Sequence, residues 1–418
     1  MRSAIPHTAR RSTRSRLTTA AAACALLSAG ALLSACSATA SATTSATALA
    51  AQQRQGGTTL QAALRRDLSD YLTTRRTAEH ISAVSLRIAF PGTRPAISLA
   101  DGTTRYKGGP PVSASALWQI GSNTKAFTAV ILLQLEAEGK LSIDDPIGTW
   151  LPQYPAWRHI TIRQLLDMTS RIPNYTSQPA FAAALAANPS ARFTTAQLVS
   201  YVAGLPLGPK GWHYTNTDYI LAQMIIEKVA HDSYASQLTQ RIIDPLRLRS
   251  TCLAPETCPP SDAARMPAGY LYIAGVPASL LGQAVPPLAL TWAQGAGGIV
   301  SSLADMTTWD RALYSGQLLP PRQQHQLESL VSEATGQPIA GTTLADPVGF
   351  GLGVQQVFSA QTGAIWDYEG QSFGNRVVHL YFPRSGMIIA LALNSATTND
   401  DIADLAGSVY QTLQNAGA

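Results

Sequence analysis

The chain has 418 residues, of which 46% are hydrophobic and 13% are charged, enough apolar material for one large domain or two ordinary ones. Five of its 30 basic residues lie within the first 16 positions, so the rest of the chain holds 25 basic and 25 acidic residues. This charge balance excludes nucleic acid as an expected partner, because no basic tract remains to bind phosphates.

The first 35 residues have the pattern of a secretory signal. An acid-free stretch with five arginines precedes the small, apolar run 17–33, which is too short and too rich in alanine for a membrane span. The run ends in Leu-Ser-Ala before Cys36, which resembles a bacterial lipobox. The resemblance implies cleavage before Cys36, lipid attachment to its sulfur, and a membrane-anchored protein of the bacterial cell envelope on the periplasmic or extracellular face. Ordinary signal cleavage nearby is the alternative.

Residues 36–57 are rich in Ser, Ala and Thr and are predicted to form a flexible tether. The folded domain is expected to span 58–416. Its first helix is predicted over 59–76, where apolar residues recur at helical spacing. A hairpin of two strands is expected at 81–90 and 96–100, joined by a Pro-Gly turn.

The middle of the chain reads as mostly helical. An almost entirely apolar helix, expected to be buried, follows Ser122 and ends near Gly139. Further helices are predicted at 160–175 (running into a loop), 180–187, 195–203, 218–230 and 233–243. Residues 259–292 are expected to form loops with short strands, and Ile299-Val300 is expected to end a buried turn.

The last part of the chain returns to strands, after a helix over 303–313 that Ser302 is expected to cap. Strands are predicted at 351–357, 363–368, 375–382 and 387–394, before a closing helix at 400–414. The N-terminal and C-terminal strands most simply join in one antiparallel sheet. We therefore predict an α+β fold of three layers, with a sheet part near 58–115 and 293–416 and a helical subdomain near 122–292.

Four cysteines are present, and Cys24 lies in the signal and Cys36 at the lipobox. Cys252 and Cys258 remain, and in an exported protein they are expected to form a disulfide; a pair of buried thiols is the alternative. The seven histidines are scattered, and no metal-binding motif occurs in the sequence. We therefore expect no metal site and no cofactor.

The clearest chemical motif is Ser122-Asn-Thr-Lys125 at the start of the apolar helix. Residues three apart share one helix face, so the Ser122 hydroxyl is expected to lie beside the Lys125 amine. A serine needs a base to become a nucleophile, and a lysine can be that base once burial lowers its pKa. Ser and Lys at this spacing also occur by chance, so the motif needs partners.

Two later segments can supply those partners. Tyr214-Thr-Asn216 precedes the helix at 218–230. The Tyr214 hydroxyl can relay a proton, and the Asn216 amide can hold a substrate carbonyl. Tyr368-Glu-Gly370-Gln371 ends a strand, where a glycine lets the substrate approach the strand edge. The backbone N–H groups of Gln371 and Ser122 can then form an oxyanion hole.

The order Ser-x-x-Lys, Tyr-x-Asn and strand-terminal x-x-Gly resembles the penicillin-recognising serine hydrolases, which include class C β-lactamases, D-alanyl-D-alanine carboxypeptidases and related esterases. The resemblance covers most of 60–416 and is closest at 214–246 and 295–313. It implies a Ser122 nucleophile, a Lys125 base, a Tyr214 acid/base, and substrate contacts at Asn216, Tyr368, Gly370 and Gln371. It implies an acyl-enzyme on an amide or ester bond, most simply of cell-wall peptides or a β-lactam. Apart from the resemblance, we expect a monomer.

Two positions depart from the family pattern. The third motif usually begins with a cation, but Tyr368 offers only a hydroxyl, and Glu369 is expected on the face that Gln371 shares. Arg171 stands where the family usually has glycine; it can reshape the rim of the cleft or replace the missing charge. These changes favour an ester, an amide or a neutral peptide end as substrate.

Other readings of the sequence remain. Gly370-Gln-Ser372-Phe-Gly374 matches the Gly-x-Ser-x-Gly pattern of hydrolases with a Ser-His-Asp triad, which makes Ser372 a rival nucleophile. A strand is predicted after it instead of the helix that this pattern requires, and the acid and the histidine follow Ser372 in the wrong order along the chain. His213 is expected to be structural. An esterase or amidase on small non-β-lactam substrates is the alternative enzyme. A non-catalytic, lipid-anchored binding protein is the alternative from another class.

Overall fold

The fold is known from a computed structural model, which describes residues 38–417 except for 274–277, 279 and 398–401. The predicted signal and Cys36 lie outside the described residues. Ten strands form one antiparallel sheet, in the order β10-β9-β11-β12-β13-β14-β15-β1-β2-β3. The N-terminal hairpin therefore pairs with the C-terminal strands through β1 and β15, as predicted.

The strands of the large sheet are β1 (Ala83–Ala89), β2 (Ile97–Arg105), β3 (Gly108–Pro111), β9 (Leu330–Ser332), β10 (Pro338–Ile339), β11 (Val348–Phe350), β12 (Gln355–Ser359), β13 (Gly363–Ser372), β14 (Asn375–Phe382) and β15 (Met387–Leu393). Two three-stranded sheets comprise β4 (Leu117–Gln119), β8 (Ile299–Ser302) and β5 (Thr251–Leu253), and β16 (Ser395–Thr397), β6 (Gly269–Tyr272) and β7 (Ala284–Val285).

The α-helices are α1 (Ala38–Glu79), α2 (Thr124–Ala137), α3 (Ile162–Leu166), α4 (Pro179–Ala187), α5 (Thr195–Ser200), α6 (Asn216–Ala230), α7 (Tyr234–Leu238), α8 (Asp244–Leu246), α9 (Gln294–Gly297), α10 (Leu303–Tyr314), α11 (Pro321–Leu327) and α12 (Ile402–Asn415). Shorter helical turns are η1 (Gly121–Asn123), η2 (Ile147–Thr149), η3 (Pro155–Trp157), η4 (Tyr175–Ser177), η5 (Thr239–Ile243) and η6 (Pro260–Arg265).

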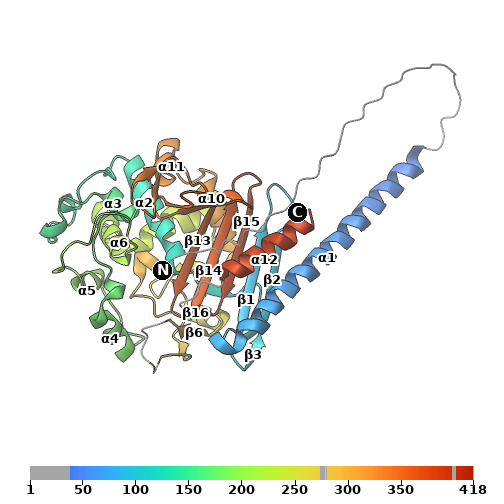
Figure 1. Cartoon of the computed structure of the whole chain (residues 1–418), viewed down its shortest axis with the longest axis horizontal. Coiled ribbons are helices and arrows are strands. Elements are labelled where there is room, and N and C mark those ends of the chain that lie inside the picture. Colours follow the sequence, from blue (N-terminus) through green and yellow to red (C-terminus); the bar gives the residue numbers. More distant parts are fainter. Residues whose placement is uncertain (1–37, 274–277, 279, 398–401, 418) are drawn as a thin grey trace, which may run out of the picture.

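Three layers result, and Figure 1 shows them side by side. Helices α1 and α12 cover one face of the sheet, and α10 with the helical part covers the other. Two apolar cores fill the spaces between the layers, a smaller one under α1 and α12 and a larger one that reaches into the helical part. All seven residues of β15 are buried, because both faces of this central strand are covered. The predicted α+β class is confirmed.

Helix α2 runs through the larger core, where 12 of its 14 residues are buried. It contacts α6, α9 and α11, which leaves little of its surface to solvent. This explains its apolar sequence on every face. As predicted, Ser302 caps α10, with its hydroxyl accepting from the Asp305 N–H, and Gly139 follows α2 with a positive φ of 72°.

Some elements differ from the sequence-based predictions. Residues 38–57, predicted to be a flexible tether, belong to helix α1; their alanines favour helix, and the packed turns from Leu60 onward supply a nucleus from which it extends. Ile299-Val300, predicted as a turn, lies in β8 between β4 and β5. Helix α11 and strands β9 and β10 were not predicted, because they are short and carry no clear periodicity.

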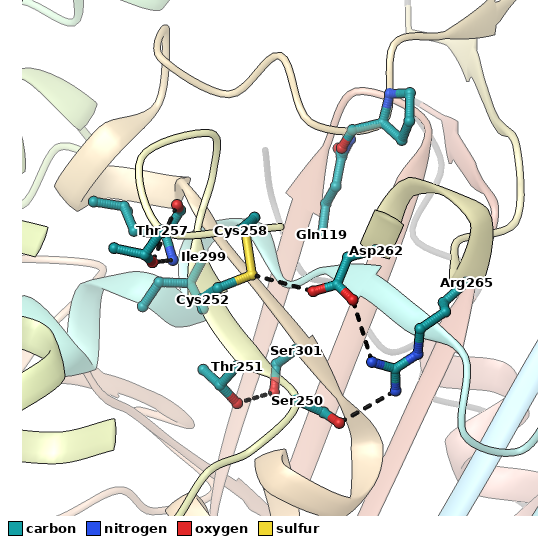
Figure 2. Close-up of a disulfide and its surroundings, with 12 residues drawn as sticks. Gln119, Ser250, Thr251, Cys252, Thr257, Cys258, Asp262, Arg265, Ile299 and Ser301 are labelled. Atoms are coloured by element: carbon teal, nitrogen blue, oxygen red, sulfur yellow. Dashed lines mark hydrogen bonds and ion pairs between the residues drawn. A yellow bond between two sulfur atoms is a disulfide. The ribbon is translucent and has the colours of Figure 1, made fainter. Parts of the chain in front are cut away.

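Cys252 and Cys258 form a disulfide, as predicted, with their Cα atoms 5.1 Å apart. Figure 2 shows the bridge at the end of β5, beside the Asp262–Arg265 ion pair. Within the described residues, no helix combines the length and the apolar character needed to cross a membrane.

Candidate active site

Ser122 and Lys125 meet at the N-terminal end of α2, as the motif predicts. The chain leaves β4, turns at Gly121 with a φ of +52° and forms η1, which places Ser122 one turn before Lys125. Lys125 Nζ lies 3.0 Å from Ser122 Oγ. Ser122 is half-buried, whereas Lys125 has no exposed surface. The nucleophile candidate is therefore reachable from outside and its base candidate is not.

The partners of Lys125 fit a neutral amine. Its Nζ lies 2.8 Å from Asn216 Oδ1 and 2.8 Å from the Ala296 carbonyl oxygen, which can only accept hydrogen bonds. A neutral amine has two N–H groups for these two acceptors, and its lone pair remains for a hydroxyl proton. Burial lowers the pKa of Lys125 well below its usual value, and Asp218 opposes this only in part.

The orientation of the Asn216 amide follows from its other contacts. Thr176 Oγ1 donates to Asn174 Oδ1 at 3.0 Å, so it accepts from Asn216 Nδ2 at 3.1 Å. Asn216 Oδ1 must then face Lys125. Asn216, predicted to contact substrate, is thus held between Lys125 and Thr176 and keeps one N–H of its amide for any further partner. Asn174 caps η4 and Thr176 lies within it, and no motif identified them from the sequence.

Tyr214 brings a second hydroxyl to the site, from the loop that precedes α6. It hydrogen-bonds Ser122 Oγ, and its OH lies 2.7 Å from Lys125 Nζ. The residue is 37% exposed, but its hydroxyl is enclosed by Ser122, Lys125 and Asn216. Loss of water around the hydroxyl raises the pKa of Tyr214 to about 12, although the neighbouring hydroxyls of Ser122 and Tyr368 act in the opposite direction. Tyr214 is therefore a protonated phenol at neutral pH, able to donate.

The predicted third motif lies against the nucleophile turn. Strand β12 pairs with β13 only as far as Trp366, so no described strand pairs with the rest of that edge of β13. A Cβ on Gly370 would lie 1.9 Å from the Ile120 carbonyl oxygen, and one on Gly121 would lie 2.9 Å from the Gln371 nitrogen. The two glycines therefore let β13 touch the turn, which brings the Gln371 backbone beside Ser122 as an oxyanion hole requires.

Tyr368 occupies the place where the resembled family usually has a cation. It is buried at 5% exposure and packs edge-to-face on Phe350, with ring centroids 5.8 Å apart. Its hydroxyl forms no well-aligned hydrogen bond within the described residues, although it is near enough to Tyr214 for each to affect the pKa of the other. Burial alternates along β13, so Glu369 and Gln371 share the opposite, partly exposed face, as predicted.

The remaining candidates lie outside this constellation. The Ser372 hydroxyl is buried and donates to Gln119 Oε1, so the rival nucleophile has no histidine partner. Arg171 Nε donates to the Gly208 carbonyl at 2.7 Å, and Arg171 therefore holds a neighbouring loop. His213 is exposed, and its backbone N–H bonds to Met168. No group of three or more metal-ligating side chains gathers in the part of the chain that the structure describes.

A buried clamp behind Ser122 was also missed from the sequence. Asn123 Nδ2 donates to the carbonyls of Ile120 and Val377, so Asn123 Oδ1 faces His379 Nδ1 at 2.8 Å. His379 Nδ1 therefore carries its proton, and Nε2 accepts from Tyr314 OH at 3.1 Å. Burial lowers the pKa of His379 to about 3, which keeps it neutral. The clamp ties the nucleophile turn to β14.

Comparison with known proteins agrees with this geometry. The family model described as "Beta-lactamase" matches residues 88–414. Penicillin-binding protein 4* of Bacillus subtilis is 28% identical over 62% of this chain, and the match spans 56% of that relative, little more than half its length. A D-stereospecific amidohydrolase from Streptomyces has a similar structure, with TM-score 0.68 and 26% identity over 84% of this chain and 97% of that one.

A D-amino acid amidase from Ochrobactrum anthropi shares the fold at TM-score 0.72 and 23% identity, over 85% of this chain and 99% of its own. The family match covers well over half of the 418 residues and includes the whole constellation around Ser122. The chain therefore belongs to the beta-lactamase family.

Proposed function

We propose that this protein is an amidase that cleaves small amides of D-amino acids or short D-peptides through an acyl-enzyme on Ser122. The observation that carries the proposal is Tyr368, a buried neutral side chain where the related carboxypeptidases and β-lactamases usually present a cation. A substrate carboxylate gains no charge partner from a phenol, whereas a neutral amide end needs none. The preference for D-substrates rests on the similarity to the D-stereospecific amidohydrolase.

The proposed mechanism uses the groups within hydrogen-bond reach of Ser122. Neutral Lys125 takes the Ser122 proton as Oγ attacks the substrate carbonyl carbon. The backbone N–H groups of Ser122 and Gln371 stabilise the oxyanion. Tyr214 donates its proton to the departing amine and regains one from Lys125, which restores the neutral amine. Water then attacks the ester carbonyl and transfers its proton to the same pair, which returns it to Ser122 as the acid departs.

Rates on four substrates test the proposal: D-phenylalanine amide, L-phenylalanine amide, an N-acyl-D-Ala-D-Ala peptide and a chromogenic cephalosporin. We expect kcat/KM for the D-amide to exceed that for each of the other three by at least tenfold. Faster turnover of the D-Ala-D-Ala peptide would replace the amidase with the carboxypeptidase that the sequence motifs also favour. Loss of all turnover in Ser122→Ala is the control for a contaminating enzyme.

We also propose that the protein is exported and anchored through a lipid on Cys36. The support is the basic and apolar signal pattern followed by a lipobox-like tetrapeptide. Metabolic labelling with a radioactive fatty acid, compared between the full chain and Cys36→Ala, tests this. Label that remains in Cys36→Ala would place the lipid elsewhere, and an unlabelled full chain would reject the anchor.

A further inference from the structure

A cavity on the far side of α10 from the nucleophile helix has no role in the reaction. It measures about 250 Å³ and lies between α10 and the turn that joins β1 to β2. Its chemical character is set by Arg87, Arg94 and Arg311, together with Phe90, Thr307 and Thr308. No aspartate or glutamate among the described residues lines it, so three cationic side chains share one small space.

Neutral groups hold two of these arginines in place. Arg87 Nε donates to Thr307 Oγ1 at 3.0 Å, and its Nη1 donates to Ser98 Oγ at 2.6 Å. Arg311 Nη1 donates to the Gly386 carbonyl and Nη2 to the Phe90 carbonyl, each at 3.1 Å. These contacts fix the guanidinium groups but cancel none of their charge.

Asp305 is the acidic residue whose charge affects Arg87, but its hydrogen bonds go to other residues. Asp305 accepts from the Ser250 N–H at 2.7 Å and from Thr251 Oγ1 at 2.9 Å, and it forms no ion pair with Arg87. Burial lowers the pKa of Arg87, and Asp305 raises it by a smaller amount. Among the residues that the structure describes, Arg87 is thus a partly desolvated cation without an ion-pair partner, which costs free energy unless an anion compensates it.

Arg94 also lines the cavity but is exposed to solvent. It is exposed on the β1–β2 turn, and its Cζ lies 3.6 Å over the Phe90 ring. Stacking leaves the edge of a guanidinium, with its N–H groups, open to a ligand. Within the described residues, no hydrogen bond or ion pair uses these groups.

We propose that this cavity binds a phosphate group, with Arg87 and Arg311 as the fixed floor and Arg94 closing over it. Guanidinium forks match the oxygens of a phosphate in pairs. Apart from Phe90 and three alanines, every residue that lines the cavity is polar or charged, so the cavity fits a compact, highly charged group better than an apolar ligand.

The phosphate can belong to a soluble compound or to a lipid headgroup, and the fold gives a reason to test both. Leu72 of α1 lies next to Gly102, which pairs with Ala83 at the start of β1. Helix α1 therefore runs antiparallel to β1, and its N-terminal part extends past the end of the sheet where the β1–β2 turn lies (Figure 1). A lipid on Cys36 would bring this end of the molecule towards a membrane.

Binding of inorganic phosphate to the purified full chain, measured by calorimetry, tests whether the ligand is a soluble phosphate compound. Sedimentation with phosphatidylglycerol vesicles, compared with phosphatidylcholine vesicles, tests whether the ligand is a lipid headgroup. Arg94→Ala removes the exposed arginine that lines the cavity, and Arg105→Ala removes an exposed arginine of β2 that does not line the cavity, so both variants lose one positive charge. Hydrolysis of a p-nitrophenyl ester verifies that each variant is folded.

We expect at least tenfold weaker binding in Arg94→Ala, to free phosphate, to the anionic vesicles or to both, and less than twofold change in Arg105→Ala. Saturation with free phosphate would identify a soluble ligand, and Arg94-dependent binding to the anionic vesicles alone would identify a headgroup. Equal loss in both variants would mean that only net charge matters and would overturn the site. If the parent protein binds neither free phosphate nor the anionic vesicles, the proposal is overturned as well.

Discussion

At the scale of single residues, the site depends on the protonation state of Lys125. Two acceptor atoms, Asn216 Oδ1 and the Ala296 carbonyl oxygen, use the two N–H groups of a neutral amine. The Ser-x-x-Lys spacing predicted that Ser122 and Lys125 meet. It did not predict what surrounds Lys125, because Ala296 and Thr176 are distant in sequence and carry no motif of their own.

The pH dependence of activity follows from that environment. A base acts only when neutral, so kcat/KM is expected to rise with pH through the pKa of Lys125. Because burial lowers this pKa, the rise is expected well below pH 10.5. Lys125→Arg keeps the charge at every pH and is expected to lose roughly 10²–10⁴-fold in kcat. The exposed Lys140→Arg serves as the control, and a rise centred near pH 10 would show that burial does not lower the pKa of Lys125.

Thr176 is expected to act through Asn216 without touching the reacting atoms. Thr176→Val removes the acceptor of Asn216 Nδ2, which frees the amide to rotate and to turn its N–H groups towards Lys125. We expect about tenfold lower kcat with little change in KM, and an acid limb displaced to lower pH, since a donor beside the amine disfavours its protonation. Thr176→Ser keeps the hydroxyl and should restore both. Equal kcat in Thr176→Val and the parent would remove this positioning role.

At the scale of elements, the site exists where β13 touches the turn between β4 and α2. The sequence predicted β13 and β14 well, since both carry runs of β-formers, and it predicted the α2 end at Gly139. It missed β8, because Ile299-Val300 is only a short apolar pair until β4 and β5 flank it. It also missed that the Ala-rich segment before Leu60 continues α1, because helix extension depends on packing further along the chain.

Gly370→Ala tests the contact between these elements. The new Cβ would lie 1.9 Å from the Ile120 carbonyl oxygen, so the turn that bears Ser122 must move. We expect about 1–3 kcal/mol lower free energy of unfolding, from urea titration, and at least tenfold lower kcat/KM. Gly341→Ala is a matched control, because its Cβ would meet no atom within 4 Å. Unchanged stability and activity in Gly370→Ala would mean that the contact is looser than the structure has it.

At the scale of the whole molecule, the two ends of the chain close one sheet. Strand β1 pairs with β15, and α1 packs beside α12 over the same apolar core. The sequence predicted this closure from strands at both ends, although it could not give the strand order, which depends on contacts between distant segments. The predicted domain boundary near residue 58 remains a prediction, and it is open to direct test.

Truncation of α1 separates its packed turns from its N-terminal extension. The first core residue of α1 is Leu60, and Leu64, Leu68, Tyr71 and Leu72 follow. A chain that starts at residue 58 is expected to keep the thermal midpoint of the chain that starts at residue 38, within about 2 °C. A chain that starts at residue 74 loses all five residues and is expected to aggregate, since each apolar side chain contributes about 1.5–3 kcal/mol. A large fall in midpoint for the first truncation would show that 38–57 belong to the folded domain.

The central claim is that Ser122 is the nucleophile, and covalent labelling tests it most directly. The measurement is the intact mass of the protein after incubation with a fluorophosphonate, for the parent, Ser122→Ala and Ser372→Ala. We expect one adduct per chain in the parent and in Ser372→Ala, and none in Ser122→Ala. An adduct that persists in Ser122→Ala, or a folded parent that takes up no label, would contradict the mechanism proposed here.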